Sequence, residues 1–172
     1  MAVRIAWFKV YHPEYYYVSY FSLRCDAYDI SIMTQDASKI KARMDYLYGK
    51  MMSKDPNNQA SKKEKDLYDT LEICYEMASR GYRLTNINIE KSLATEFLVN
   101  PENNHEIIPP FKVLDGLGDN VAVSIVEARN ERPFISKEDL INRTQLSNTL
   151  IKKMDEMGIL KNLDDTNQIS LF

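Results

Sequence analysis

Two closely spaced glycines, Gly116 and Gly118, form the strongest candidate for a binding site in this sequence. They bracket the apolar Leu117 and precede Asp119 and Asn120, either of which can begin a helix. Glycine adopts backbone geometries that are closed to other residues, and it leaves the amide groups of a helix N-terminus bare. Those amides suit a phosphate oxygen, so the segment predicts a phosphate-binding turn between two helices.

The residues after this turn have the spacing of a helix with one buried face. That face carries Ala122, Ile125, Val126 and the stem of Arg129. The small Ala122 allows a second helix to pack closely against it. A glycine turn joined to such a helix is typical of a helix-hairpin-helix motif. This motif would bind the DNA backbone without reading bases, and the binding would be sensitive to salt.

Two carboxylates weaken the phosphate-binding interpretation of the glycine turn. Asp115 stands where such motifs usually have proline, and Asp119 follows the second glycine. Basic and acidic residues are equally numerous between 111 and 161, so no basic stripe compensates for these carboxylates. The alternative is that the turn is only a structural joint between two helices.

Residues 136–158 repeat the helix, turn and helix pattern without the glycine pair. Ser136 can begin a first short helix, Ser147 can begin a second, and Gly158 can end it. Each of the basic residues of this unit could equally be ordinary surface. Its candidate phosphate contacts are Arg143, Lys152 and Lys153.

The last residues of the chain are a candidate docking peptide. They are Gln168, Ile169, Ser170, Leu171 and Phe172. Leu171 and Phe172 would fill an apolar cleft of another protein, and the Gln168 amide would fix the orientation by hydrogen bonding. The polar run 163–167 is typical of a flexible tether. The alternative is that the tail folds back onto its own domain.

Composition limits the possible function classes. A chain of 172 residues with 44% hydrophobic content suits one domain or two small ones. The net charge of -3 means that any DNA contact must be local. No apolar stretch reaches transmembrane length, and no secretory signal opens the chain. Cys25 and Cys74 fit free thiols in a reducing cytosol, and His12 and His105 fit structural roles better than metal ligation.

The elements that must position these candidate sites are mostly helices. Pro13 predicts a break within a helical segment at 4–23, whose dense tyrosines predict burial on more than one face. Asp36 predicts the cap of a second helix, and Ser61 with Glu64 predicts a capping box. The expected elements are helices at 4–23, 36–52 and 61–79 (ended by Gly81), a short strand at 82–89, and a hairpin of 96–99 with 106–108.

The first residues already form a dense mixed apolar segment at 3–10, without a leader or a cap. Such a segment is typical of the inside of a folded element. We therefore expect the chain to be a fragment of a longer protein, with Met1 and Ala2 as an added start.

Several segments together resemble a known family, the PolC-type replicative DNA polymerase, which is the DNA polymerase III alpha subunit of low-GC Gram-positive bacteria. The resemblance covers essentially the whole chain in order, so it is more specific than any single motif. The matching segments are 6–13, the tyrosine-rich run ending at Tyr20-Phe21, Arg24, 80–82, 108–111, 114–129, 134–140 and 167–172.

The resemblance implies a mainly α fold with a small β element. Residues 1–108 would be the helical end of the fingers domain, and 109–162 would be a duplex-DNA-binding region of tandem helix-hairpin-helix units. Residues 163–172 would be a flexible tail that ends in the sliding-clamp-binding peptide, with Ile169 standing where leucine is commoner. The implied partners are primer–template duplex, the sliding clamp (the DNA polymerase III beta subunit) and the rest of the polymerase chain, with no membrane.

The same resemblance implies a DNA-directed DNA polymerase, a nucleotidyltransferase, as the full-length protein. Its palm carboxylates and their magnesium ions would lie upstream of residue 1, as would the proofreading exonuclease. This part of the chain should therefore hold no cofactor and have no polymerase activity alone. The expected localisation is cytoplasmic, with the nucleoid-associated replication machinery.

Two other interpretations remain at this point. One is a stand-alone, non-sequence-specific DNA-binding or repair adaptor with a partner-docking tail, which would be a complete protein with its own start. The other is a structural helical scaffold that does not bind nucleic acid. The scaffold predicts that bulky residues in place of Gly116 and Gly118 change no binding property.

Overall fold

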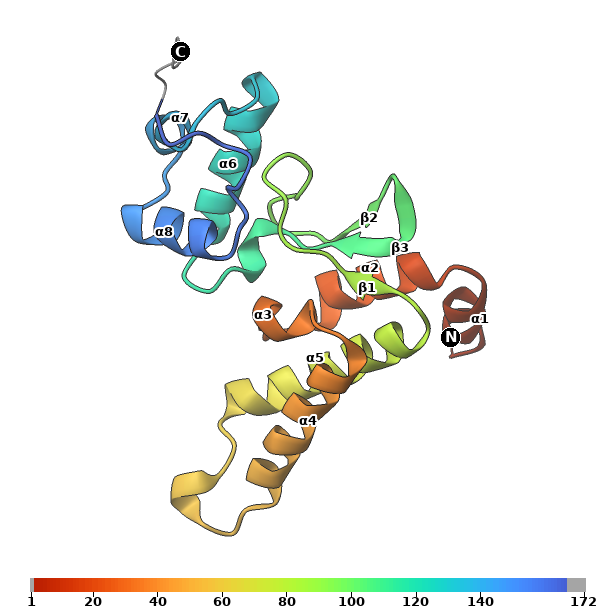
Figure 1. The fold of residues 1–172 in the computed structure, drawn as a ribbon. Coiled ribbons are helices and arrows are strands. Elements are labelled where there is room, and N and C mark those ends of the chain that lie inside the picture. The colour runs from red at the N-terminus through yellow and green to blue at the C-terminus, as the bar shows by residue number, and fades with distance from the viewer. Residues whose placement is uncertain (1, 167–172) are drawn as a thin grey trace.

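The computed structural model describes residues 2–166 and is mainly helical, with one small sheet (Figure 1). The fold class expected from the sequence is therefore confirmed in its coarse form. Its helices are α1 (Ala2–Tyr11), α2 (Pro13–Arg24), α3 (Ile30–Met33), α4 (Ala37–Met52), α5 (Lys62–Ser79), α6 (Asp119–Glu131), α7 (Lys137–Arg143) and α8 (Asn148–Glu156), with 3-10 turns η1 (Pro56–Asn58) and η2 (Phe111–Val113). No helix between residues 2 and 166 is long and apolar enough to cross a membrane.

The two N-terminal helices meet at the predicted break. His12 has non-helical backbone angles, and Pro13 occupies the first turn of α2, where its missing N–H costs no hydrogen bond. Pro13, Tyr17 and Phe21 of α2 are buried, and the half-buried Tyr16, Val18 and Tyr20 pack against the same core. Burial thus extends over much of the helix surface, as expected, while Tyr15 and Leu23 stay exposed at 52% and 78%.

Helices α4 and α5 form an antiparallel pair that projects from the body of the molecule (Figure 1). Asp36 caps α4 by accepting a hydrogen bond of 3.0 Å from the Lys39 amide. Ser61 and Glu64 form the predicted capping box at the start of α5, and Gly81 follows its end with φ +82°. Both helices and their caps are therefore as predicted.

A three-stranded sheet in the order β1-β3-β2 lies against α2. Its strands are β1 (Arg83–Leu84), β2 (Leu98–Asn100) and β3 (Asn103–Ile108). β2 and β3 are antiparallel, which confirms the predicted hairpin, and β1 is parallel to β3. The predicted strand at 82–89 is shorter than expected. The Asn88 side chain accepts the amides of Glu90 and Lys91 and so folds the chain into a turn.

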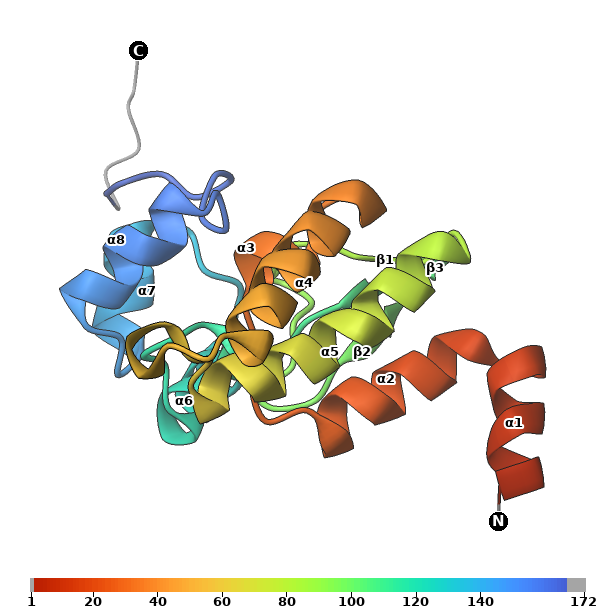
Figure 2. The same ribbon diagram turned by 90° about the horizontal axis from the view of Figure 1, so that it is seen from below.

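The C-terminal helices α6, α7 and α8 gather at the end of the molecule that is remote from α1 (Figures 1 and 2). One continuous hydrophobic core joins them to the rest, running from Tyr17 to Leu160. The core crosses the predicted boundary between 108 and 109, which stays a prediction. Cys25 and Cys74 are free thiols, as expected.

Arg129 fastens α6 to the loop that precedes the sheet hairpin. Its guanidinium donates to the carbonyl oxygens of Ile89 at 3.1 Å and Ser92 at 2.8 Å. Ser92 in turn donates from its hydroxyl to the Pro109 carbonyl at 2.7 Å. Burial lowers the pKa of Arg129, although an arginine stays charged at any physiological pH.

A second polar cluster fixes α7 against the end of α6. The buried Asp139 accepts from Arg132 at 2.7 Å and from Arg143 at 3.1 Å. Arg143 also donates to the carbonyls of Ala128 and Arg132 and lies 5.0 Å from the centre of the Phe134 ring. Burial raises the pKa of Asp139, but the hydrogen bonds from the two arginines outweigh this effect and hold the pKa below its usual range.

Glu64 should make the folded state sensitive to acid. The Lys50 ammonium and the Ser61 amide lower the pKa of Glu64 from 4.5 to about 2. A carboxylate with a lowered pKa stabilises the fold above its unfolded pKa, and this stabilisation is lost as the pH falls from 4.5 towards 2. We expect Glu64→Gln to reduce the fall of the thermal unfolding midpoint as the pH is lowered through this range. The control is Glu72→Gln, which removes a carboxylate from the exposed side of the same helix and should leave this pH dependence as in wild type. If the midpoint of Glu64→Gln depends on pH as in wild type, Glu64 is not the source of the acid sensitivity.

Asp139 should contribute strongly to stability because Arg143 depends on it. We expect Asp139→Asn to lower the free energy of unfolding by about 2–3 kcal/mol, since it leaves the largely buried Arg143 guanidinium with only the exposed and more distant Glu131 as counter-ion. The control is Asp155→Asn, which removes a half-exposed partner of Lys137 and should change the free energy by less than about 1 kcal/mol. Urea denaturation followed by circular dichroism measures both, and similar losses would contradict the special role of Asp139.

Candidate functional site

The glycine turn adopts two different backbone geometries. Gly116 has φ +90°, a left-handed conformation that side chains disfavour. Gly118 has φ −79° and ψ 160°, an ordinary extended conformation. The expectation that both glycines need a special conformation therefore applies to Gly116 alone. Leu117 between them is buried, and its amide donates to the Leu114 carbonyl at 2.9 Å, which closes the turn.

Gly118 leaves the N-terminus of α6 open. It is the N-cap residue, and no side chain caps the helix. The first backbone hydrogen bond of α6 runs from the Ala122 amide to the Gly118 carbonyl at 3.0 Å, so the amides of Asp119, Asn120 and Val121 precede the helical ladder. A Cβ atom added at Gly118 would meet no atom within 4 Å. The absence of a side chain there is thus required neither by backbone strain nor by internal packing.

The structure offsets the charge of Asp115. The Lys63 ammonium lies 3.3 Å from its Oδ1, and the Lys153 ammonium lies 3.8 Å from its Oδ2. Lys153 also donates to the Asp115 main-chain carbonyl at 2.7 Å. Two cations thus surround one carboxylate beside the glycine turn, and the expected repulsion of phosphate by Asp115 is largely removed. Asp119 is exposed, as is Asn120.

From the sequence alone, a phosphate contact at Lys63 is possible but not favoured. This lysine belongs to a group of lysines in the first turn of α5, and the sequence favours a solvated surface for such a group. Its approach to Asp115 joins positions far apart in the chain, so no local spacing could indicate it. The only sequence signal for a basic site here is that three lysines lie beside the residues of the capping box, namely Lys62, Lys63 and Lys65.

The second helical unit is formed as predicted, but its three candidate contacts do not lie together. Ser136 and Ser147 cap α7 and α8 through the amides of Asp139 and Leu150. The Arg143 side chain is 14% exposed and is engaged in the Asp139 cluster, so its geometry favours a structural role. Lys153 lies at the glycine turn instead. Lys152 is exposed and has no ion pair with any other residue between 2 and 166.

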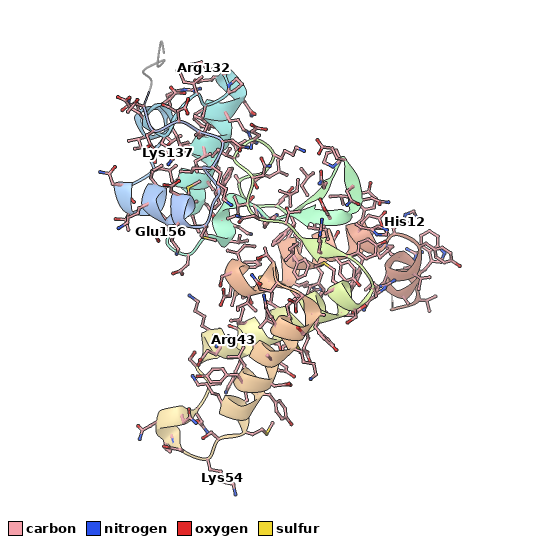
Figure 3. All side chains as sticks on the ribbon, in the orientation of Figure 1. His12, Arg43, Lys54, Arg132, Lys137 and Glu156 are labelled. Atoms are coloured by element: carbon pink, nitrogen blue, oxygen red, sulfur yellow. The ribbon has the colours of Figure 1, made fainter. Side chains whose placement is uncertain are left out.

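The start of the predicted tether is hydrogen-bonded to α7 at Asp164 and Asp165, while the flexibility of 163–172 stays a prediction. The amides of Lys137 and Glu138 donate to the carbonyls of Asp164 at 2.7 Å and Asp165 at 3.3 Å. The Lys137 ammonium, labelled in Figure 3, also pairs with Asp165 at 2.8 Å and Asp155 at 2.9 Å. The candidate docking residues Gln168, Ile169, Ser170, Leu171 and Phe172 lie outside the described residues.

Within residues 2–166, no group of three or more His, Cys, Asp or Glu side chains is arranged to hold a metal ion. The two histidines contact aromatic rings. His12 packs near Trp7 and Phe8, and the ring of His105 lies 4.6 Å from that of Tyr82.

Comparison with known proteins gives two consistent results. A family model described as a helix-hairpin-helix motif matches residues 81–169. The whole chain is also 49% identical to part of the DNA polymerase III PolC-type of Streptococcus sanguinis, 49% to that of Streptococcus pneumoniae (strain D39) and 48% to that of Staphylococcus aureus (strain MRSA252). In each case the alignment covers 100% of this chain and 11% of the relative, so the chain spans about a tenth of the length of these relatives.

The family match includes the glycine turn, the open N-terminus of α6 and both helices of the second unit. The chain therefore belongs to the helix-hairpin-helix family, and along its whole length it is related to a segment of the PolC-type DNA polymerases III.

Proposed function

We propose that this chain is the C-terminal, duplex-binding part of a PolC-type replicative DNA polymerase. It would hold primer–template DNA by the backbone and dock the sliding clamp through its terminal peptide. The observation that carries the DNA-binding half of this proposal is the uncapped N-terminus of α6, where Gly118 opens the backbone amides to an approaching group.

A phosphate oxygen would accept hydrogen bonds from the amides at Asp119, Asn120 and Val121. The partial positive charge of a helix N-terminus favours such an anion, and the lack of a side chain at Gly118 allows it to come close to the backbone. Lys63 and Lys153 supply long-range attraction, reduced by their pairing with Asp115. Contacts of this kind hold any base sequence equally, so they suit an enzyme that must move along its template.

The terminal peptide would add a weak second contact. Burial of Leu171 and Phe172 contributes roughly 1.5–3 kcal/mol each, and part of this is lost in ordering the tail. The peptide alone should therefore bind at around micromolar affinity. Because DNA contact and clamp contact belong to one chain, each raises the effective concentration of the other. Two weak contacts then give a persistent complex that can still be released.

In this proposal the polymerase activity belongs to the full-length protein in the cytoplasm. Residues 1–108 would complete the fingers domain. The catalytic carboxylates and their magnesium ions would lie in the remaining nine-tenths of such a protein, outside the 11% to which this chain corresponds. Isolated residues 1–172 should then bind duplex without extending a primer.

Gly118→Asp should separate DNA binding from stability. Aspartate is a favourable N-cap that would occupy the amides of α6 with its own carboxylate, so stability should be unchanged or higher by a few tenths of a kcal/mol. Duplex affinity at about 50 mM salt should fall at least about tenfold, because the phosphate site is blocked by a negative charge. Fluorescence anisotropy with a labelled duplex at about 50 and 200 mM salt measures both the affinity and its salt dependence.

The matched control for this substitution is Asn103→Asp at the start of β3. It adds the same charge at an exposed site remote from α6, and it keeps the acceptor for the His105 amide. Its affinity should stay within about twofold of wild type, consistent with a small screened effect of a remote charge. Equal loss in both variants would show that overall charge, and not the α6 terminus, governs binding. Wild-type binding that is absent or independent of salt would contradict backbone recognition altogether.

Removal of the terminal peptide should abolish clamp binding. We expect Leu171→Ala combined with Phe172→Ala to weaken binding to the purified sliding clamp by at least about 100-fold, by loss of apolar burial. Ile169→Leu, which restores the residue expected from the family resemblance, should bind at least as tightly as wild type. Isothermal titration or surface plasmon resonance provides the affinities. Unchanged affinity after deletion of residues 168–172 would exclude the docking proposal.

A further inference from the structure

A cleft beside the glycine turn contains an arginine that has no hydrogen-bond or ion-pair partner among residues 2–166. The cleft has a volume of about 380 Å³ and lies between the α3–α5 region and the segment that leads into the turn. Its walls include Arg43 from α4, Lys63 from α5, Asp115 from the turn and Lys153 from α8. In the view of Figure 3, Arg43 lies between Lys54, at the far end of the α4–α5 pair, and Glu156 on α8.

Arg43 is half-buried, and its guanidinium makes no hydrogen bond or ion pair with any residue between 2 and 166. Its Nε atom is fully shielded by the protein and has no acceptor. The guanidinium carbon lies 5.2 Å from the centre of the Tyr46 ring. A shielded guanidinium nitrogen without an acceptor destabilises the fold, and an anion bound in this cleft would offset that cost.

The carboxylates on the cleft walls do not serve as acceptors for Arg43, because each is engaged elsewhere. Glu64 binds Lys50 and the Ser61 amide. Asp115 is held by lysines of α5 and α8, and Asp29 accepts a hydrogen bond of 2.5 Å from the Ser31 hydroxyl. The positive charge of Arg43 thus remains available, and the planar fork of an arginine matches two oxygens of one phosphate.

We propose that this cleft binds a phosphodiester group of the same DNA strand that the Gly116–Gly118 turn holds, with Arg43 as its main cation. The cleft and the turn share Asp115 and its two lysines, so a strand leaving the α6 terminus passes directly into reach of Arg43. This proposal rests on the DNA binding proposed above. It extends the interface from the helix-hairpin-helix units to the α4–α5 pair.

The test compares Arg43→Gln with Lys41→Gln in duplex titrations over a series of salt concentrations. Both variants remove one positive charge from α4, but Lys41 is exposed and paired with Asp45 at 3.0 Å. We expect Arg43→Gln to reduce the slope of log affinity against log salt by about 0.9, the value for one phosphate contact, with a loss of affinity at low salt. Lys41→Gln should leave the slope as in wild type.

A spectroscopic measurement keeps the test independent of folding defects. The Nε–H resonance of Arg43 in the wild-type protein, assigned through its disappearance in Arg43→Lys, should shift on addition of a short duplex at low salt. An unchanged slope in folded Arg43→Gln, or an unmoved resonance at saturating duplex, overturns the cleft proposal while leaving backbone binding at α6 intact. A shift with inorganic phosphate but none with duplex also overturns it, since the site would then take a free anion. Absence of duplex binding by the wild-type protein instead rejects the proposed function itself.

Discussion

The position of the glycine turn depends on one half-buried guanidinium. Arg129 cannot lose its charge, so its burial requires acceptors, and it finds them in the main-chain carbonyls of Ile89 and Ser92. These bonds fix α6 to a loop that lies before the sheet hairpin in sequence. The amides of Phe111 and Lys112 bond to the same region, at the carbonyls of Leu93 and Ala94, and hold the entry to the turn. The open end of α6 is therefore presented by a rigid support.

This support explains how a chain with a net charge of -3 could offer the proposed phosphate site. The attraction would come from oriented backbone amides, whose partial charge acts within the first turn of a helix, and not from overall charge. Lysines from α5 and α8 meet at Asp115 and would keep that carboxylate from opposing the site. The remaining acidic residues would contribute little where they are distant and screened by salt. In this proposal, local geometry outweighs composition.

The sequence predicted those elements whose signals are local. The caps at Asp36 and Ser61, the break at Pro13 and the hairpin of β2 and β3 each depend on a few neighbouring residues, and the structure confirms them. Contacts between distant segments could not be predicted, because helical periodicity does not say which element covers which face. The approach of Lys63 to Asp115 and the engagement of Arg143 by Asp139 are of this kind.

The attachment of Asp164 and Asp165 to α7 has a geometric consequence for the proposed clamp contact. A chain extends by at most about 3.6 Å per residue, so the three residue steps from Asp165 to the proposed docking peptide span at most about 11 Å. A protein that binds the terminal peptide must then come almost into contact with α7, because the connection between them is short. In the proposed complex, this short connection would limit the direction from which the clamp approaches, as well as the strength of binding.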